Sequence, residues 1–263
     1  MFLNNHHCTH SYQLGHLSLV EEAREHNDIV VASIYVNPTQ FGPNEDLDKY
    51  PRQLESDTKL LEQLGVDHIF CPADMYNDHH RCFIDPVGFD NFREGSARPG
   101  HFRGVATIVT KLLNIVQPTR AYFGQKDAAQ CALIKRLVHD LDMDVDVKIM
   151  RTIRESDGLA MSSRNAYLNE EQRKAAAVLF KSLTAAQEIF EAAFAGNLPM
   201  DAKIISETVV GVLKREPLVE EIEYVAVDSK ETMEPLKEIE YEGAIVSIAV
   251  KIGNVRLIDN FIL

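Results

Sequence analysis

The chain has 263 residues, 45% of them hydrophobic and 25% charged, the balance of a globular protein with one large or two ordinary domains. Its formal net charge of −13 argues against nucleic-acid or anionic-membrane binding, because both need a basic surface. No apolar run approaches the roughly 20 residues of a membrane span, and no signal-peptide pattern is visible. The 4 cysteines form no Cys-x-x-Cys pair or disulfide framework, which favours a cytoplasmic protein.

Residues 1–13 are predicted to be an irregular segment. His6, His7, Cys8 and His10 suggest a metal site, but their spacing fits no familiar zinc motif, so a loosely ordered terminus is the preferred interpretation.

A helix is predicted from residue 14 to about residue 25. Gly15 would let the backbone approach a ligand closely, and His16 in the first turn could donate a hydrogen bond to a phosphate oxygen. The alternative is a helix cap followed by a packed histidine.

The apolar run over 28–37 is typical of a central parallel strand covered on both faces. It ends in a loop rich in Pro, Gly and Asn, where Asn37 and Gln40 could offer amides to a hydroxy acid. Ordinary turn chemistry explains the asparagine, whereas Gln40 has no strong structural reason to be there. A helix to residue 64 and a strand at 68–71 follow.

The predicted loop 72–99 leads into a glycine-rich segment that carries Arg98, His101 and Arg103. These groups suit an anion-handling loop in an acidic protein, and a solvated connection is the alternative. Apolar residues then recur with a helical period from Val105 to Val116, so that one helix face packs on the sheet.

The stretch 120–130 is the strongest signal for a ligand site. A buried strand at 120–123 precedes a helix over 127–141, with Asp127 as its N-cap. Lys126 lies where the strand gives way to the helix, which is the edge at which open α/β sheets bind ligands, and a helix N-terminus attracts phosphate. The competing interpretation is a surface lysine in a loop between strand and helix. The spacing is not that of a P-loop.

A strand at 143–153 is followed by a loop to residue 165 that contains Ser162, Ser163 and Arg164. Hydroxyls and a guanidinium in a row suit a phosphate clamp. A flexible connector between domains is the alternative, and the two are compatible because hinges often carry ligand groups.

The alternation of strands and helices predicts an α/β domain over 1–155, with a doubly wound parallel sheet of Rossmann-like type. Residues 156–263 change character and predict a small α+β domain. Asn169 and Gln172 form a capping-box pattern before a long helix that Gly196 ends, and a second helix spans 201–214. Strands at 221–228, 245–251 and 255–259 include a hairpin at Gly253-Asn254.

Taken together, these motifs resemble the pantoate–β-alanine ligase (pantothenate synthetase) family, nucleotidyltransferases with a His-x-Gly-His signature. The resemblance runs from about Leu14 to the end of the chain, in the family's order and spacing. Its anchors are residues 15–20, 37–41, 98–105, 124–127, 162–165 and 256–260.

The resemblance implies an ATP-dependent ligase that condenses pantoate with β-alanine through a pantoyl-adenylate intermediate and releases AMP and pyrophosphate. It implies Mg²⁺ with the ATP, a homodimer, and a C-terminal domain that closes as a lid. Small-molecule substrates, without nucleic acid or membrane, are the expected partners.

The resemblance also assigns residues. His16 and Lys126 are the implied catalytic groups, and Gln40 and Gln130 hold pantoate, with Gln40 bordering the β-alanine site. Asn37, Arg98 and His101 support them. The implied ATP-binding residues are Gly15, His16, Gly124, Gln125, Lys126, Asp127, Ile153, Met161, Ser162, Ser163 and Arg164.

The chain departs from the family pattern near its start. Gln13 stands where the first signature histidine is expected, His10 replaces a loop glycine, and the preceding strand is missing. Ala129 stands where the family usually has the first of two glutamines, and Gln125 stands where the family frequently has a Glu. The alternative function is therefore a catalytically weak or inactive nucleotide- and pantoate-binding member. A different acid substrate is a further alternative, against which Gln40 and Gln130 argue.

Overall fold

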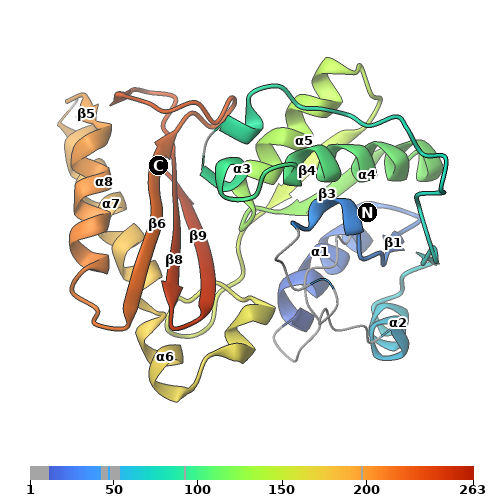
Figure 1. Ribbon diagram of the computed structural model, residues 1–263, viewed down its shortest axis with the longest axis horizontal. Coiled ribbons are helices and arrows are strands. Elements are labelled where there is room, and N and C mark those ends of the chain that lie inside the picture. The colour runs from blue at the N-terminus through green and yellow to red at the C-terminus, as the bar shows by residue number, and fades with distance from the viewer. Residues whose placement is uncertain (1–11, 43–46, 48–53, 92, 197) are drawn as a thin grey trace. The chain divides into compact units, whose positions relative to one another are not determined.

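The computed structural model describes residues 12–42, 47, 54–91, 93–196 and 198–263. The chain divides into two compact units (Figure 1). The first comprises Met1–Gln125 and Ala129–Arg151, and the second comprises Lys126–Ala128 and Thr152–Leu263. Residues 1–11, with their histidines, lie outside the described residues. No described helix is both long and apolar enough to cross a membrane.

The first unit contains parallel strand pairs connected through helices. β1 (Val31–Ser33) pairs with β2 (His68–Phe70), and β3 (Arg120–Gly124) pairs with β4 (Asp146–Met150), both in parallel register. The helices of this unit are α1 (Tyr12–His26), α2 (Leu54–Gln63), α3 (Arg93–Ala97), α4 (His101–Val116) and α5 (Ala128–Asp140). Parallel strands that alternate with helices confirm the α/β class.

Within the described residues the parallel strands form two separate pairs, β1-β2 and β3-β4. β1 is also much shorter than the predicted strand over 28–37, because the chain turns into the short 3-10 helix η1 (Pro38–Gln40) soon after it. The loop predicted over 72–99 contains the 3-10 helix η3 (Phe89–Asn91) and the short helix α3.

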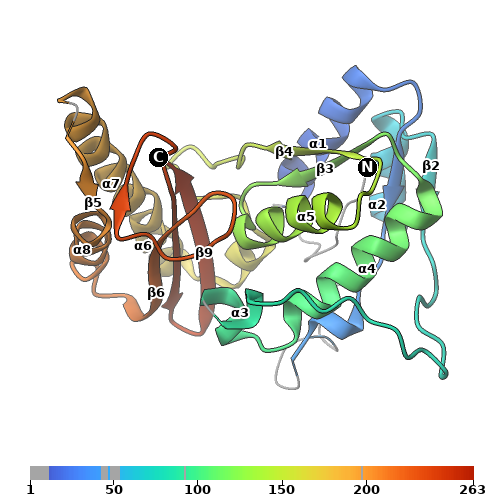
Figure 2. The same ribbon diagram turned by 90° about the horizontal axis from the view of Figure 1, so that it is seen from above.

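Two apolar clusters hold this unit together. Tyr122 of β3 packs with Val20 of α1 and Ala32 of β1, and its hydroxyl accepts a hydrogen bond from Asn27 Nδ2 at 2.8 Å. The second cluster joins α4, β3 and α5, and β3 and β4 run side by side next to α5 in Figure 2. Its α4 members are Val105, Ile108, Val109, Leu112 and Leu113, which confirms the predicted helical periodicity.

The second unit is built on an antiparallel sheet of β6 (Val219–Asp228), β8 (Ile245–Ile252) and β9 (Val255–Ile262), in the order β6-β8-β9. Gly253 has a φ of +56° in the turn between β8 and β9, which confirms the hairpin prediction. A separate two-stranded antiparallel sheet pairs β5 (Met200–Asp201) with β7 (Glu238–Ile239).

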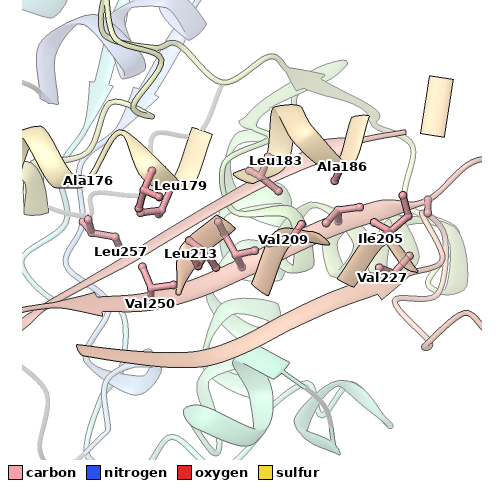
Figure 3. Close-up of a cluster of buried hydrophobic side chains, with 14 of the residues drawn as sticks. Ala176, Leu179, Leu183, Ala186, Ile205, Val209, Leu213, Val227, Val250 and Leu257 are labelled. Atoms are coloured by element: carbon pink, nitrogen blue, oxygen red, sulfur yellow. The ribbon is translucent and has the colours of Figure 1, made fainter. Parts of the chain in front are cut away.

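The core of the second unit lies between that sheet and the helices α7 (Val178–Ala195) and α8 (Ala202–Leu213), as Figure 3 shows. Leu183, Ile205, Val209, Leu213 and Val250 are fully buried there. Burying one such side chain contributes roughly 1.5–3 kcal/mol, so this cluster is the main source of the unit's stability.

The capping box at Asn169 is confirmed. Its Oδ1 accepts from Gln172 N at 2.9 Å, and Gln172 Oε1 accepts from Asn169 N at 3.0 Å. The predicted long helix is wrong in its continuity, because α6 (Glu170–Ala175) ends before α7 begins. Leu179 N bonds Ala176 O at 3.1 Å, a tightened i→i+3 turn that interrupts the α-helical pattern.

Candidate functional site

His16 lies in the first turns of α1, next to Gly15, and is partly buried. Ser18 Oγ donates to Gly15 O at 2.9 Å, which ties the start of the helix together. The helix begins at Tyr12, so Gln13 is part of it.

Gln40 is the centre of a buried polar network in the first unit. Asn37 and Gln40 expose only 1% and 2% of their surface. Asn37 Nδ2 donates to Gln40 Oε1 at 3.0 Å and to Gly104 O at 3.1 Å. These bonds fix the Gln40 amide with its oxygen toward Asn37.

Arg98 and His101 hold the Gln40 backbone. His101 Nδ1 donates to Gln40 O at 2.9 Å, and Arg98 donates to the same oxygen at 3.3 Å. Arg98 also donates to His101 Nε2 at 3.3 Å. A neutral ring with its proton on Nδ1 satisfies both bonds of His101. The two side chains are therefore structural supports of Gln40 and not a solvated connection.

Glu94 completes this network and was missed by sequence reasoning. Its Oε1 lies 3.3 Å from Arg98, and the two side chains expose only 11% and 14%. Its position four residues before Arg98 was the available signal. Arg103 does not join the network, since its guanidinium stacks 4.0 Å above the Phe83 ring.

The close approach of α4 to η1 depends on a glycine. A Cβ at Gly104 would overlap the carbonyl group of Thr39 and the amide nitrogen of Gln40. Any side chain at position 104 would therefore displace the segment that carries Gln40.

Gln130 lies in the first turn of α5 and exposes 9% of its surface. Cys131 Sγ donates to Gly124 O at 3.3 Å, and Gln125 N donates to Met150 O at 2.8 Å. These bonds fix the end of β3 against α5 and β4. The helix predicted over 127–141 is confirmed, starting one residue after Asp127.

Lys126 follows β3 but groups with the second unit. Its Nζ lies 3.4 Å from Asp127 Oδ1, and the two side chains are 20% and 38% exposed. Its carbonyl oxygen accepts a hydrogen bond from Asn260 Nδ2 at 2.9 Å. Lys126 thus has an anchored backbone and a partly accessible ammonium group.

The segment from Ile153 to Arg164 is a turn held by hydrogen bonds within it. Met161 N donates to Ile153 O at 2.9 Å, and Arg154 and Ala160 form an antiparallel bridge. Ser162 caps η4 (Ser163–Tyr167), with its Oγ accepting from Arg164 N at 3.3 Å. Hydrogen bonds thus give this segment a defined local structure, and Ile153 itself is 37% exposed.

A buried ion pair holds this turn to β9, and sequence reasoning missed it. Arg154 donates to both carboxylate oxygens of Asp259, at 2.7 and 3.0 Å, and to Gly158 O at 2.9 Å. The guanidinium lies 5.0 Å from the rings of Phe180 and Phe261. Burial raises the pKa of Asp259, while Arg154 and the charge of Lys126 act in the opposite direction.

Among the described residues, one group of potential metal ligands comes together outside these segments. Glu22, Glu25 and His26 have ligand atoms within 4.8 Å of one another near the end of α1. Glu25 is nine residues from His16, about 14 Å along a helix, so this group is separate from the predicted phosphate contact.

Comparison with known proteins identifies the family. The family model described as pantoate–β-alanine ligase matches residues 10–262. Pantothenate synthetase from Fervidobacterium nodosum is 52% identical over 251 residues, which are 95% of this chain and 87% of the relative. The relative from Herpetosiphon aurantiacus is 49% identical over 95% of this chain and 89% of its own.

Solved structures agree. Pantothenate synthetase from Thermus thermophilus superposes with a TM-score of 0.86 at 42% identity, covering 94% of this chain and 88% of that one. Pantoate–β-alanine ligase from Francisella tularensis, solved with a β-γ ATP compound and β-alanine, has a TM-score of 0.74 at 32% identity over 99% and 88% of the chains. This chain therefore belongs to the pantoate–β-alanine ligase family, the ATP-binding ligases of pantothenate biosynthesis.

Proposed function

We propose that the enzyme forms pantothenate in two steps through pantoyl adenylate. A carboxylate oxygen of pantoate attacks the α-phosphorus of ATP, and the bond from that phosphorus to the bridging oxygen breaks, so that pyrophosphate leaves. The amine of β-alanine then attacks the acyl carbon and loses a proton, and AMP leaves with the former carboxylate oxygen. The observation that carries this proposal is the Francisella relative, solved with an ATP compound and β-alanine.

The proposed nucleotide contacts come from short segments of the chain around Gly15, Gly124 and Met161. Lys126 and Arg164 supply charge to the phosphates, and His16 acts as the acid group near them. The remaining proposed ATP contacts are Gly15, Gly124, Gln125, Asp127, Ile153, Met161, Ser162 and Ser163. The anchored Lys126 backbone and the capped turn at Ser162 support this role, because preorganised donors stabilise developing charge without reorganisation.

Pantoate is held by Gln40 and Gln130, and Gln40 also borders β-alanine. Both amides are almost fully buried, which suits recognition of hydroxyl and carboxylate groups in a dry pocket. A dry pocket also protects the mixed anhydride from water. Asn37, Arg98 and His101 support this role by fixing Gln40.

Mg²⁺ enters with ATP as part of the substrate. It prefers carboxylate and phosphate oxygens, usually with one or two protein carboxylates. Asp127 is the carboxylate of the proposed phosphate segment and is partly exposed beside Lys126, so its chemistry fits this ion. Asp127 would hold the ion beside the phosphates, and the ion would supply positive charge to them when bound.

The architecture belongs to the same proposal. The pairs β1-β2 and β3-β4 are parts of one doubly wound parallel sheet in the proposed ATP- and pantoate-binding domain, residues 1–155, and residues 156–263 form the proposed small α+β domain. The parallel register of both pairs supports this arrangement. The enzyme is a cytoplasmic homodimer; Cys71, Cys82 and Cys131 form no disulfide among the described residues, which suits a reducing compartment.

An isotope experiment tests the two-step route. With pantoate labelled with ¹⁸O in its carboxylate, the route predicts one ¹⁸O in each AMP and none in pyrophosphate, measured by mass spectrometry. Label absent from AMP would show that the carboxylate does not attack the α-phosphorus. Binding of ATP and pantoate by calorimetry without any turnover would instead support the inactive, ligand-binding alternative.

A further inference from the structure

We propose that Asn260, near the end of β9, is a positioning residue for adenylate formation, acting through Lys126. This inference rests on the proposed phosphate-binding role of Lys126. Neither Asn260 nor Asp259 contributes to any step described above, yet both are buried polar side chains on a strand of the second unit.

The hydrogen bond from Asn260 fixes the backbone from which Lys126 projects. Asn260 is 2% exposed, and its Nδ2 donates to Lys126 O at 2.9 Å, across 134 positions of sequence. A lysine side chain is long and loses much rotamer freedom when it is held in one place. Fixing its peptide unit confines where Nζ can reach, and a misplacement of about 1 Å can cost about 10²-fold in rate.

Asp259 makes the position of Asn260 rigid. Asp259 Oδ1 accepts from Asn260 N at 2.8 Å and is itself held by Arg154. The side chain of Asp259 is 0% exposed, and Arg154 is 19% exposed. Buried charge-assisted bonds in low dielectric hold their geometry tightly.

The same strand end therefore holds two proposed nucleotide segments. Asn260 binds the Lys126 backbone, and Asp259 binds Arg154, which donates to Gly158 O inside the turn that precedes Ser162. Successive residues of a strand face opposite sides, so adjacent positions serve both segments at once. Lys126–Ala128 accordingly groups with the second unit, although the flanking residues group with the first.

A purely structural role for Asn260 and a positioning role make different predictions. A structural defect lowers the folded fraction and affects every step in proportion. A positioning defect lowers the adenylation rate only as long as the ammonium group of Lys126 is present to be misplaced. A double-mutant cycle separates the two, because interacting residues give non-additive effects.

The experiment measures pantoate-dependent ATP–pyrophosphate exchange for Asn260→Ala, Lys126→Ala and the double variant of the full chain, with thermal unfolding of each. We expect Asn260→Ala to lower the maximal exchange rate about 10- to 100-fold with a smaller change in the KM for ATP. In the Lys126→Ala background, the same substitution should change the rate less than about twofold.

Asn260→Asp keeps the size of the side chain but lacks the Nδ2 donor. It replaces Asn260→Ala in the exchange measurement if Asn260→Ala does not fold. Lys251→Ala is the matched control: it removes an exposed ion pair with Glu221 on the same sheet and should retain full exchange. Register places it four strand pairs from Asn260, about 13 Å away.

Wild-type exchange in both Asn260 variants, or full additivity in the double variant, would overturn the inference while leaving the role of Lys126 intact. Wild-type exchange in Lys126→Ala would overturn the phosphate role and the inference together. Loss of exchange in every variant with a parallel loss of folded protein would also overturn it, as a structural defect.

Discussion

His101 Nδ1 donates to the carbonyl oxygen of Gln40 at 2.9 Å, so the helix α4 directly holds the residue proposed to bind pantoate. We predict that His101→Ala raises the KM for pantoate about tenfold and leaves the KM for ATP within about twofold, since losing one buried hydrogen bond costs roughly 1–3 kcal/mol. Steady-state kinetics with each substrate varied in turn measures both. His139→Ala, at an exposed site in the same unit, is the control; equal effects on both substrates would contradict a role confined to Gln40.

Gly104 gives a second way to disturb Gln40, from the backbone side. Gly104→Ala would push its Cβ into the Thr39 carbonyl, and we expect a loss of about 1–3 kcal/mol in the free energy of unfolding, together with weaker pantoate binding. Gly211→Ala in α8 meets no atom within 4 Å and should stabilise the protein by about 0.5–1 kcal/mol. Urea unfolding and calorimetry with pantoate check both variants, and a stable Gly104→Ala protein with normal affinity would refute the predicted clash.

Gln130 should contribute more to the binding of pantoate than to the binding of ATP. Gln130→Ala removes a nearly buried amide from the first turn of α5, and we expect pantoate affinity to fall about tenfold with ATP affinity almost unchanged. Calorimetric titration with each ligand separates the two. Gln117→Ala, just past the end of α4, removes an amide at a site without a proposed ligand role. Equal losses for both ligands in Gln130→Ala would contradict the assignment.

The sequence predicted those features whose causes are local. The capping box at Asn169, the apolar stripe of α4 and the hairpin at Gly253 each depend on residues within a few positions of one another, and each is confirmed. The sequence could not delimit β1, because its apolar run continues as buried chain beyond the strand.

The long-range contacts around the site had no local signal. Arg154 and Asp259 are 105 positions apart, and Lys126 and Asn260 are 134 apart, so neither pair follows from spacing. Arg98 and His101 were expected to handle anions because of their charge. In the structure they contact Glu94 and the Gln40 backbone, which their charges alone do not predict. The sequence pattern therefore suggests candidate site residues, but it does not show which of them contact one another.

The pH dependence of stability should include a contribution from Asp157. Hydrogen bonds from Arg173 lower the pKa of this carboxyl below its usual 3.8. Its stabilising effect is thus fully present above about pH 4 and is lost as the pH falls through the lower, folded-state pKa. We predict that Asp157→Asn lowers stability at pH 7, by no more than ~1 kcal/mol because the pair is partly exposed to solvent. Urea unfolding at pH 7 and at about pH 3 should show the difference from the wild type shrinking; a constant difference would exclude this linkage.

Pantoate-dependent exchange of labelled pyrophosphate into ATP tests the central claim most directly, because it reports adenylate formation without the second step. The account predicts exchange that requires pantoate and Mg²⁺, proceeds without β-alanine, and is strongly reduced but still measurable in Lys126→Ala with the protein still folded. The absence of exchange in pure, folded wild-type protein, or exchange that is independent of pantoate, would contradict it.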